Sequence, residues 1–238
     1  MPTQNFLYKR EYPINDSIRI IIPTVGEIID NEDAYYGLVS VLTAMPVDML
    51  VQLEDAGIDF TSINEYELFL RLFTGFKSQD TRLIFGDLDL SKFEMTVNKQ
   101  NGNIVLLDKE HDIKIDRAIH GQIAGVLRKI HHIEKNNRKP ANEESKKYML
   151  ERARAKQRRF RNCKEDSQLE SLIIAMVNTE QYKYDFEGTR ELSIYQFNES
   201  VRQVIKKVDY DNRMYGVYAG TVNAKDLSQD DLNWLTHK

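Results

Sequence analysis

The side chains that could do chemistry do not assemble into a complete catalytic or metal-binding motif. The sequence has no G-x-x-x-x-G-K-[ST] phosphate loop, no G-x-G-x-x-G fingerprint and no G-x-S-x-G nucleophile turn. None of the histidines belongs to an H-E-x-x-H pair; they are His111, His120, His131, His132 and His237. His120 and His131 can share one helix face, but a zinc site needs at least a third ligand. We therefore predict no enzyme activity, no cofactor and no bound metal.

Two further groups of reactive side chains have simpler explanations. Asp87-Leu-Asp89 could hold magnesium through paired carboxylates, but the Glu-x-Lys or histidine that a metal nuclease also needs does not follow at Glu94. We expect Gly86, Asp87 and Asp89 to form a turn between two strands. Cys163 has basic neighbours that would activate a thiol, but no histidine lies near it in sequence.

Charge is distributed very unevenly along the chain. Residues 128–164 carry fourteen Lys or Arg and four Glu, a balance of +10, whereas the rest of the chain has a balance of −14. The most basic stretch runs from Arg152 to Arg161. Its cations are the candidate partner-binding residues, namely Arg152, Arg154, Lys156, Arg158, Arg159 and Arg161.

Three roles are open for this basic stretch: a solvated helix face, a nucleic-acid contact, or a contact with an acidic protein surface. A protein that binds single strands usually interleaves aromatic residues for base stacking, and only Phe160 is available here. The acidic sequence pI of about 5.8 also argues against nonspecific DNA binding. Nucleic acid is thus the less favoured partner.

The first part of the chain predicts a short strand followed by helices. Residues 17–23 are rich in β-branched side chains and end at Pro23, which is typical of a strand. We predict helices over residues 26–45, from Pro46 to about Gly57, and from Ser62 to about Gly75. Ser62 and Glu65 have the spacing of a capping box at the start of the third helix.

The middle of the chain predicts a small antiparallel sheet over about residues 82–115. The four expected strands are Arg82–Phe85, Phe93–Val97, Ile104–Leu107 and Ile113–Ile115. Asn101-Gly102-Asn103 lies between two of them and is typical of a hairpin turn. Phe93, Met95 and Val97 alternate with polar residues, so we expect them on one buried face.

The last part of the chain predicts helices again. Asp116 should cap a helix that runs to about Lys135, and residues 136–140 should form a linker. Residues 142–162 should form a basic helix with almost no apolar stripe, which packing can hold only weakly. Further helices are expected from Ser167, over residues 191–208, and from Ser228 through Trp234.

These elements predict an α+β fold that is mostly helical, with N-terminal helices, a small sheet and a C-terminal helical bundle. We divide the chain into an α+β domain over residues 1–135, a basic linker and helix over 136–166, and a helical region over 167–238. The periodic apolar stripes give an expected core, which includes Phe69, Phe73, Ile123, Leu127, Leu172, Ile173, Phe197 and Val201.

Three segments together resemble a known family. They are residues 35–69, residues 115–135, and residues 192–197 with 232–235. The layout is similar to poorly characterised proteins encoded in the morphogenesis modules of phages and prophages of Gram-positive bacteria. Some of these resemble tail-assembly chaperones, which keep the tape-measure protein soluble. The resemblance implies a non-enzymatic role in virion assembly, and it assigns no functional residues to this chain.

The resemblance and the charge pattern together predict a tail-assembly chaperone or scaffold that acts through protein–protein contacts. Its partners would be other morphogenesis proteins, with the tape measure or the tail tube first. The alternative is a virion structural subunit of the connector, tail or baseplate. A third hypothesis is a nucleic-acid-binding regulator that uses Arg152 to Arg161. Because no stretch approaches 18 apolar residues, we expect no membrane partner. The resemblance implies a location in the bacterial host cytoplasm, with the virion as alternative.

Overall fold

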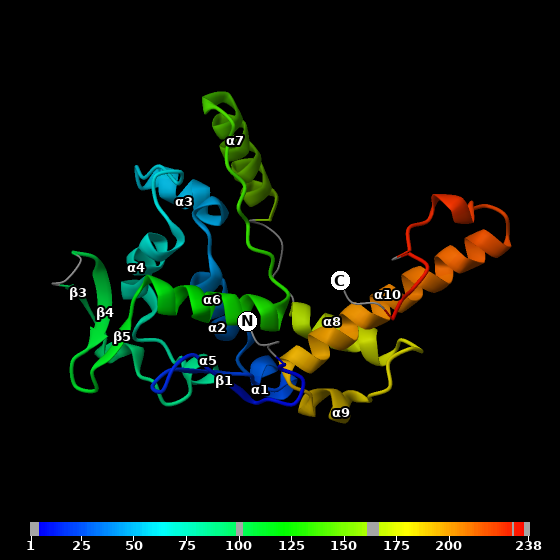
Figure 1. Ribbon diagram of the computed structural model, residues 1–238, viewed down its shortest axis with the longest axis horizontal. Coiled ribbons are helices and arrows are strands. Elements are labelled where there is room, and N and C mark those ends of the chain that lie inside the picture. The colour runs from blue at the N-terminus through cyan, green and yellow to red at the C-terminus, as the bar shows by residue number, and fades with distance from the viewer. Residues whose placement is uncertain (1–4, 99–101, 161–166, 230, 236–238) are drawn as a thin grey trace.

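The computed structural model describes residues 5–98, 102–160, 167–229 and 231–235. It confirms an α+β fold that is mostly helical (Figure 1). The chain begins with a two-stranded antiparallel sheet of β1 (Glu11–Pro13) and β2 (Arg19–Ile21). β2 confirms the strand expected before Pro23. Ile18, Ile20 and Ile22 alternate along this segment and are all buried.

The helix expected over residues 26–45 is interrupted and forms two helices, α1 (Val25–Ile29) and α2 (Glu32–Thr43). Thr24 and Glu27 form a reciprocal capping box that starts α1. The helix ends at Asp30, and Asn31 has a φ of −145°, which is outside the helical range. The expected continuous helix was wrong because the backbone turns at this point.

The next expected helices are present with different boundaries. After Pro46 a 3₁₀ turn, η1 (Pro46–Met49), leads into α3 (Leu50–Asp55). Helix α4 (Glu65–Phe76) has Asn64 as its N-cap, with Glu67 as the reciprocal partner. The capping box expected at Ser62 and Glu65 was wrong, because the Ser62 hydroxyl instead donates to the Asp59 carbonyl in the preceding turn.

The small antiparallel sheet is confirmed, but it contains three strands, which are β3 (Glu94–Val97), β4 (Ile104–Asp108) and β5 (Ile113–Ile115). The first expected strand is a short helix, α5 (Arg82–Phe85), followed by η2 (Leu90–Lys92). Backbone hydrogen bonds to the Thr81 carbonyl start α5, and Gly86, at a φ of +63°, ends it. The Asp87 to Asp89 turn therefore links α5 to η2 and not two strands.

The buried face expected along β3 was wrong for two of its three residues. Phe93 is fully buried, but Met95 is 43% exposed and Val97 is 63% exposed. β3 is an edge strand, and the sheet extends beyond the helices that cover β5 (Figure 1). Asn101, in the expected hairpin turn, lies outside the described residues.

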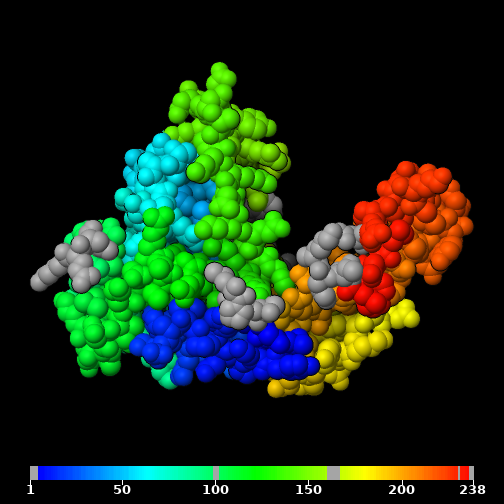
Figure 2. Space-filling view, in the orientation of Figure 1, coloured from blue at the N-terminus to red at the C-terminus, as the bar shows by residue number. Residues whose placement is uncertain are grey.

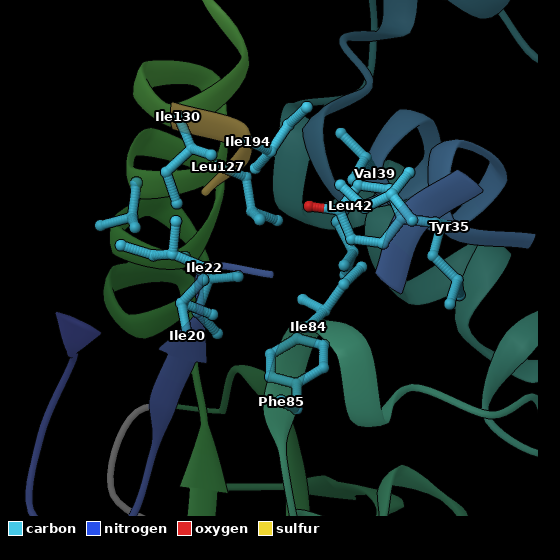
Figure 3. Packing of buried hydrophobic residues seen from close by; sticks show 14 of the residues in the cluster. Ile20, Ile22, Tyr35, Val39, Leu42, Ile84, Phe85, Leu127, Ile130 and Ile194 are labelled. Atoms are coloured by element: carbon cyan, nitrogen blue, oxygen red, sulfur yellow. The ribbon is translucent and has the colours of Figure 1, made fainter. Parts of the chain in front are cut away.

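Helix α6 (Arg117–His131) is the central element of the fold. Asp116 caps it, as expected, by accepting hydrogen bonds from the backbone of Ala118 and Ile119. Its apolar stripe is fully buried and consists of Ile123, Val126, Leu127 and Ile130. α6 packs against α2, α4, β2, β5 and α10. The main core therefore forms around one helix face (Figure 3).

The C-terminal helices join this same core. They are α8 (Gln168–Val177), α9 (Phe186–Glu191) and α10 (Ile194–Tyr218). Ile194 lies beside Leu127 and Ile130 in the core (Figure 3). Two backbone hydrogen bonds bind the start of α10 to the N-terminal segment: Ile194 N–H donates to Pro23 at 2.8 Å, and Val25 N–H donates to Leu192 at 2.9 Å.

Helix α10 extends beyond the body of the molecule (Figure 1). Its first turn buries Ile194 and Phe197, but none of its described residues after Phe197 is buried. The following segment contains η3 (Ala224–Asp226) and then folds back along the helix. Trp234 is half-buried under Lys207, whose Nζ lies 5.5 Å from the ring centroid. The helix expected from Ser228 was wrong for the described residues up to 235, which form turns.

The division at residues 135 and 167 stays a prediction. The main apolar cluster takes residues from both sides of it, including Leu127 before the basic helix and Phe197 after it. Of the eight expected core residues, six are buried. Leu172 and Val201 are only partly buried, since each lies at the border of the cluster.

Truncation should cost much more stability at buried positions than at an exposed one. Phe73→Ala and Phe197→Ala remove fully buried rings and should each lower the free energy of unfolding by about 3–5 kcal/mol. Tyr218→Ala, at an 84% exposed position, should change it by less than about 0.5 kcal/mol. Chemical denaturation measures all three. Similar small losses at every position would contradict the described core.

Candidate partner-binding groove

The basic helix is α7 (Glu143–Phe160), and it is packed against α3 rather than isolated. Met149, Leu150 and Ala153 on one face of α7 contact a second, smaller apolar cluster. This cluster contains Leu50, Val51, Leu53, Phe60 and Leu68. The expectation of a weakly held helix missed this contact, because three apolar residues on one face suffice to complete a small core.

Ion pairs reinforce the contact between α7 and the acidic α3 region. Lys146 Nζ lies 2.7 Å from an oxygen of Asp59, and Arg154 Nη2 lies 2.5 Å from an oxygen of Asp55. The hydrogen bond from Lys146, together with those from Thr61, lowers the pKa of Asp59 to about 2. One edge of α7 thus has its positive charge neutralised within the chain.

The linker before α7 is also held in place. Lys135 Nζ lies 2.5 Å from Glu65, and the Asn136 amide donates to Asp48 at 2.7 Å. Glu65 also pairs with Arg128, a buried residue of α6. Burial alone would raise the pKa of Glu65, but the hydrogen bonds from Lys135 and Arg128 lower it below its usual range.

A groove of about 1310 Å³ runs between η1 and α3, the linker and α7. Figure 2 shows α3 and α7 together on the same side of the body. We refer to this feature as the α7 groove. Its apolar lining comes mainly from Val47, Leu50, Val51, Met149, Ala153 and Ala155. Its basic side chains are Arg138, Lys139, Arg152, Lys156 and Arg159.

The structure divides the six predicted partner-binding residues into separate positions. Arg152, Lys156 and Arg159 recur at intervals of four and three residues, and all three line the α7 groove. Arg154 is paired with Asp55, and Arg158 is exposed without lining the groove. Arg161 lies outside the described residues, as does Cys163. The partner-binding role of these six residues stays a prediction, and three of them line the groove.

Sequence reasoning missed the other wall of the groove. Arg138 and Lys139 lie in the segment that was treated only as a linker, and Val47 lies in η1. Among the described residues, no carboxylate forms an ion pair with Arg138, Lys139, Arg152 or Lys156. The available signal was the basic composition of Arg138-Lys139, but its proximity to α7 depends on the packing of α3.

Another group of polar residues has the composition of a metal site. Ligand atoms of Asp108, Glu110 and His111 lie within 4.8 Å of one another. These atoms already serve the turn between β4 and β5. Asp108 accepts from the Glu110 backbone at 2.9 Å and lies 2.7 Å from His111 Nδ1, while Glu110 pairs with Lys92 at 3.0 Å. The cluster is therefore explained by the turn, and Asp89 similarly caps η2 through Ser91.

The two histidines that share α6 do not point to a common ligand. His131 Nε2 lies 2.9 Å from the Tyr35 hydroxyl, whereas His120 stacks on Phe69 with ring centroids 4.2 Å apart. Burial lowers the pKa of each imidazole to about 4. Both side chains therefore act as neutral core residues. His237 lies outside the described residues.

A family model described as the YomV second domain matches residues 162–238. That domain is of phage and prophage type. The match suggests a phage-associated protein. It covers α8, α9 and α10 and does not include the described part of α7. No curated protein and no solved structure matches the chain.

Within the described residues, no helix combines the length and the apolar composition that a membrane crossing requires. The longest described helix, α10, carries several Lys, Arg and Asp residues between Arg202 and Arg213.

Acidification should destabilise the protein through its buried histidines. Because the pKa of His131 is about 4 in the folded protein and about 6.5 in an exposed chain, the unfolded state binds the proton first as the pH falls. The contribution is complete above about pH 6.5 and is lost between pH 6.5 and 4, at up to about 1.4 kcal/mol per pH unit. Denaturation at several pH values should give a shallower dependence for His131→Gln. Equal slopes for both proteins would contradict this assignment.

Disrupting the apolar contact should release α7 alone. Leu150→Asp places a carboxylate against the smaller cluster, so amide hydrogen exchange should rise across residues 143–160 and stay unchanged across 168–177. Tyr148→Asp is the matched control, because it adds the same charge at a 63% exposed position. If α7 exchanges equally fast in the wild type and in Leu150→Asp, the helix is not held by this contact.

Proposed function

We propose that this chain is a non-enzymatic phage tail morphogenesis protein that acts through protein–protein contacts, as a tail-assembly chaperone or scaffold. The observation that carries the proposal is the α7 groove, where basic side chains border an apolar lining. Such a surface suits a protein partner better than a substrate. The phage-type match of residues 162–238 supports the biological setting.

In this proposal the partner is another morphogenesis protein, with the tape measure or the tail tube as first choice. The site of action is the bacterial host cytoplasm. The proposal includes the absence of catalysis and of a cofactor, since the reactive groups of the described residues serve caps, turns and core contacts. A virion structural subunit remains the alternative function. A nucleic-acid-binding regulator is the third, and the basic residues of α7 are its motivation.

The decisive experiment is recovery of partners from an infected host lysate with the tagged protein. The wild type should recover tail proteins, and Arg152→Glu with Lys156→Glu should recover much less, because both cations line the groove. Lys147→Glu with Arg158→Glu is the matched control, since it makes the same charge change at exposed positions outside the groove. Higher salt should reduce the recovery of tail proteins by proteins that keep the groove cations, and should change it little for the variant that has lost them.

Two results would replace this function, and a third would show that the groove has no part in it. Recovery of nucleic acid without tail protein would support the regulator hypothesis. Abundant protein in purified virions would support the structural subunit, because a chaperone should remain in the lysate. Equal recovery by the wild type and both variants would remove the groove from the function.

A further inference from the structure

We propose that the α7 groove binds an acidic amphipathic helix of the partner protein. This inference rests on the proposed function and specifies the chemistry of its partner. The apolar side of the bound helix would contact Val47 and Met149, and its carboxylates would pair with Arg152 and Lys156. The feature that would recognise the partner is the combination of an apolar and a basic surface in one groove.

The apolar lining requires a partner with an apolar face. Val47 and Met149 are only partly buried by the chain itself, so a ligand can still remove part of their surface from water. Ala153 and Ala155 contribute small side chains along α7. Small residues let a second helix approach the backbone closely, as at other helix–helix contacts. A purely polar ligand would leave this lining unused.

The charges in the groove require carboxylates on the partner. Among the described residues, Arg138, Lys139, Arg152 and Lys156 line it without an ion pair to a carboxylate, and the acidic lining residues are Asp48 and Glu151. Asp48 is already occupied, because it accepts hydrogen bonds from the Met45 backbone and from the Asn136 amide. The ion pairs that attach α7 use Asp55 and Asp59, neither of which lines the groove. An acidic partner would therefore not compete with the internal pairs.

The spacing of the cations favours a helix over an extended strand. Arg152, Lys156 and Arg159 fall on one stripe of α7, an 18-residue helix. At about 1.5 Å per residue, this stripe offers charges roughly 5–6 Å apart. Carboxylates three and four residues apart on a helix have the same separation. Alternate residues of a strand are about 6.6 Å apart, so successive carboxylates of a strand would fall progressively farther from successive cations of α7.

Nucleic acid fits the groove less well. Among the described side chains that line it, Tyr148 is the one aromatic ring, so successive bases would have one stacking position there. Phosphates would also meet the apolar lining of Val47 and Met149, which gives them no hydrogen-bond donor. The structure therefore favours the protein partner.

The test is a fluorescence anisotropy titration of the full chain with a labelled synthetic peptide as long as α7. This peptide carries leucine at positions i, i+3, i+4 and i+7 and mostly glutamate elsewhere. A scrambled peptide has the same composition without an apolar face. The wild type should bind the amphipathic peptide at least about tenfold more tightly than the scrambled one.

Two variants and one control locate the binding. Arg152→Glu with Lys156→Glu should weaken binding by about tenfold or more. Ala155→Trp fills the exposed groove without changing charge and should weaken binding similarly. Lys147→Glu with Arg158→Glu should stay within about twofold of the wild type, because neither residue lines the groove. Circular dichroism verifies that each variant keeps its helix content.

The outcomes separate this inference from the proposed function. Equal affinity for the two peptides, or an equal loss in the control variant, would overturn the inference, since charge alone would then explain binding. Tighter, variant-sensitive binding of a single-stranded oligothymidine of about 20 nucleotides would replace the helix with nucleic acid. If the peptide binds as expected but the lysate yields no tail protein, the helix-binding groove stands and the morphogenesis function fails.

Discussion

The burial of one face of α6 is the interaction on which the rest of the structure depends. Ile123, Val126, Leu127 and Ile130 lie along this face, and helices from both ends of the chain pack on it. The hydrophobic effect is nondirectional, so the stripe alone does not fix the angle of each neighbour. Specific polar contacts supply the direction. His131 meets the Tyr35 hydroxyl on α2, and Arg128 donates to the Thr43 carbonyl and to Glu65.

The two helices that extend from this body are attached by different physics. Helix α10 starts inside the main core and emerges from it, so buried apolar side chains and main-chain hydrogen bonds attach it. Helix α7 follows a linker and lies on a separate small cluster, bordered by ion pairs to Asp55 and Asp59. Ion pairs at exposed positions are weak and are screened by salt. Salt should therefore weaken the polar part of the contact that holds α7 beside the groove, while the apolar part stays.

Sequence patterns predicted the elements whose signals are local and repeated. The stripe of α6, its Asp116 cap and the Ser167 cap of α8 were all readable, since each depends on spacing within one helix. Two errors have a common cause. Arg82–Phe85 has strand-like residue types, and Met95 and Val97 have strand-like alternation. In both places tertiary position decided the outcome: α5 packs against β2, and β3 lies at an exposed sheet edge.

The candidate site could be predicted only in part for a similar reason. Charge counting located the basic residues of α7. It could not distinguish Arg154, which pairs with Asp55 of α3, from Arg152, which lines the groove. That separation depends on which side of α7 contacts α3. Val47 carries no signal of function by itself, because an isolated valine before a helix is ordinary in any core.

The junction between Pro23–Val25 and Leu192–Ile194 bears on how such a protein can change during evolution. The C-terminal segment exchanges two main-chain hydrogen bonds with residues 23–25: Leu192 accepts one and Ile194 donates the other. Arg190 lies so close to Gly26 that a β-carbon there would be only 2.5 Å from its side chain. If recombination transferred residues 162–238 to an unrelated gene, Ile194 would lose its neighbours Leu127 and Ile130, whereas Phe197 would keep its ring contact with Tyr182. The segment could therefore be exchanged between proteins only where the recipient supplies backbone groups equivalent to those of Pro23 and Val25, and a glycine equivalent to Gly26.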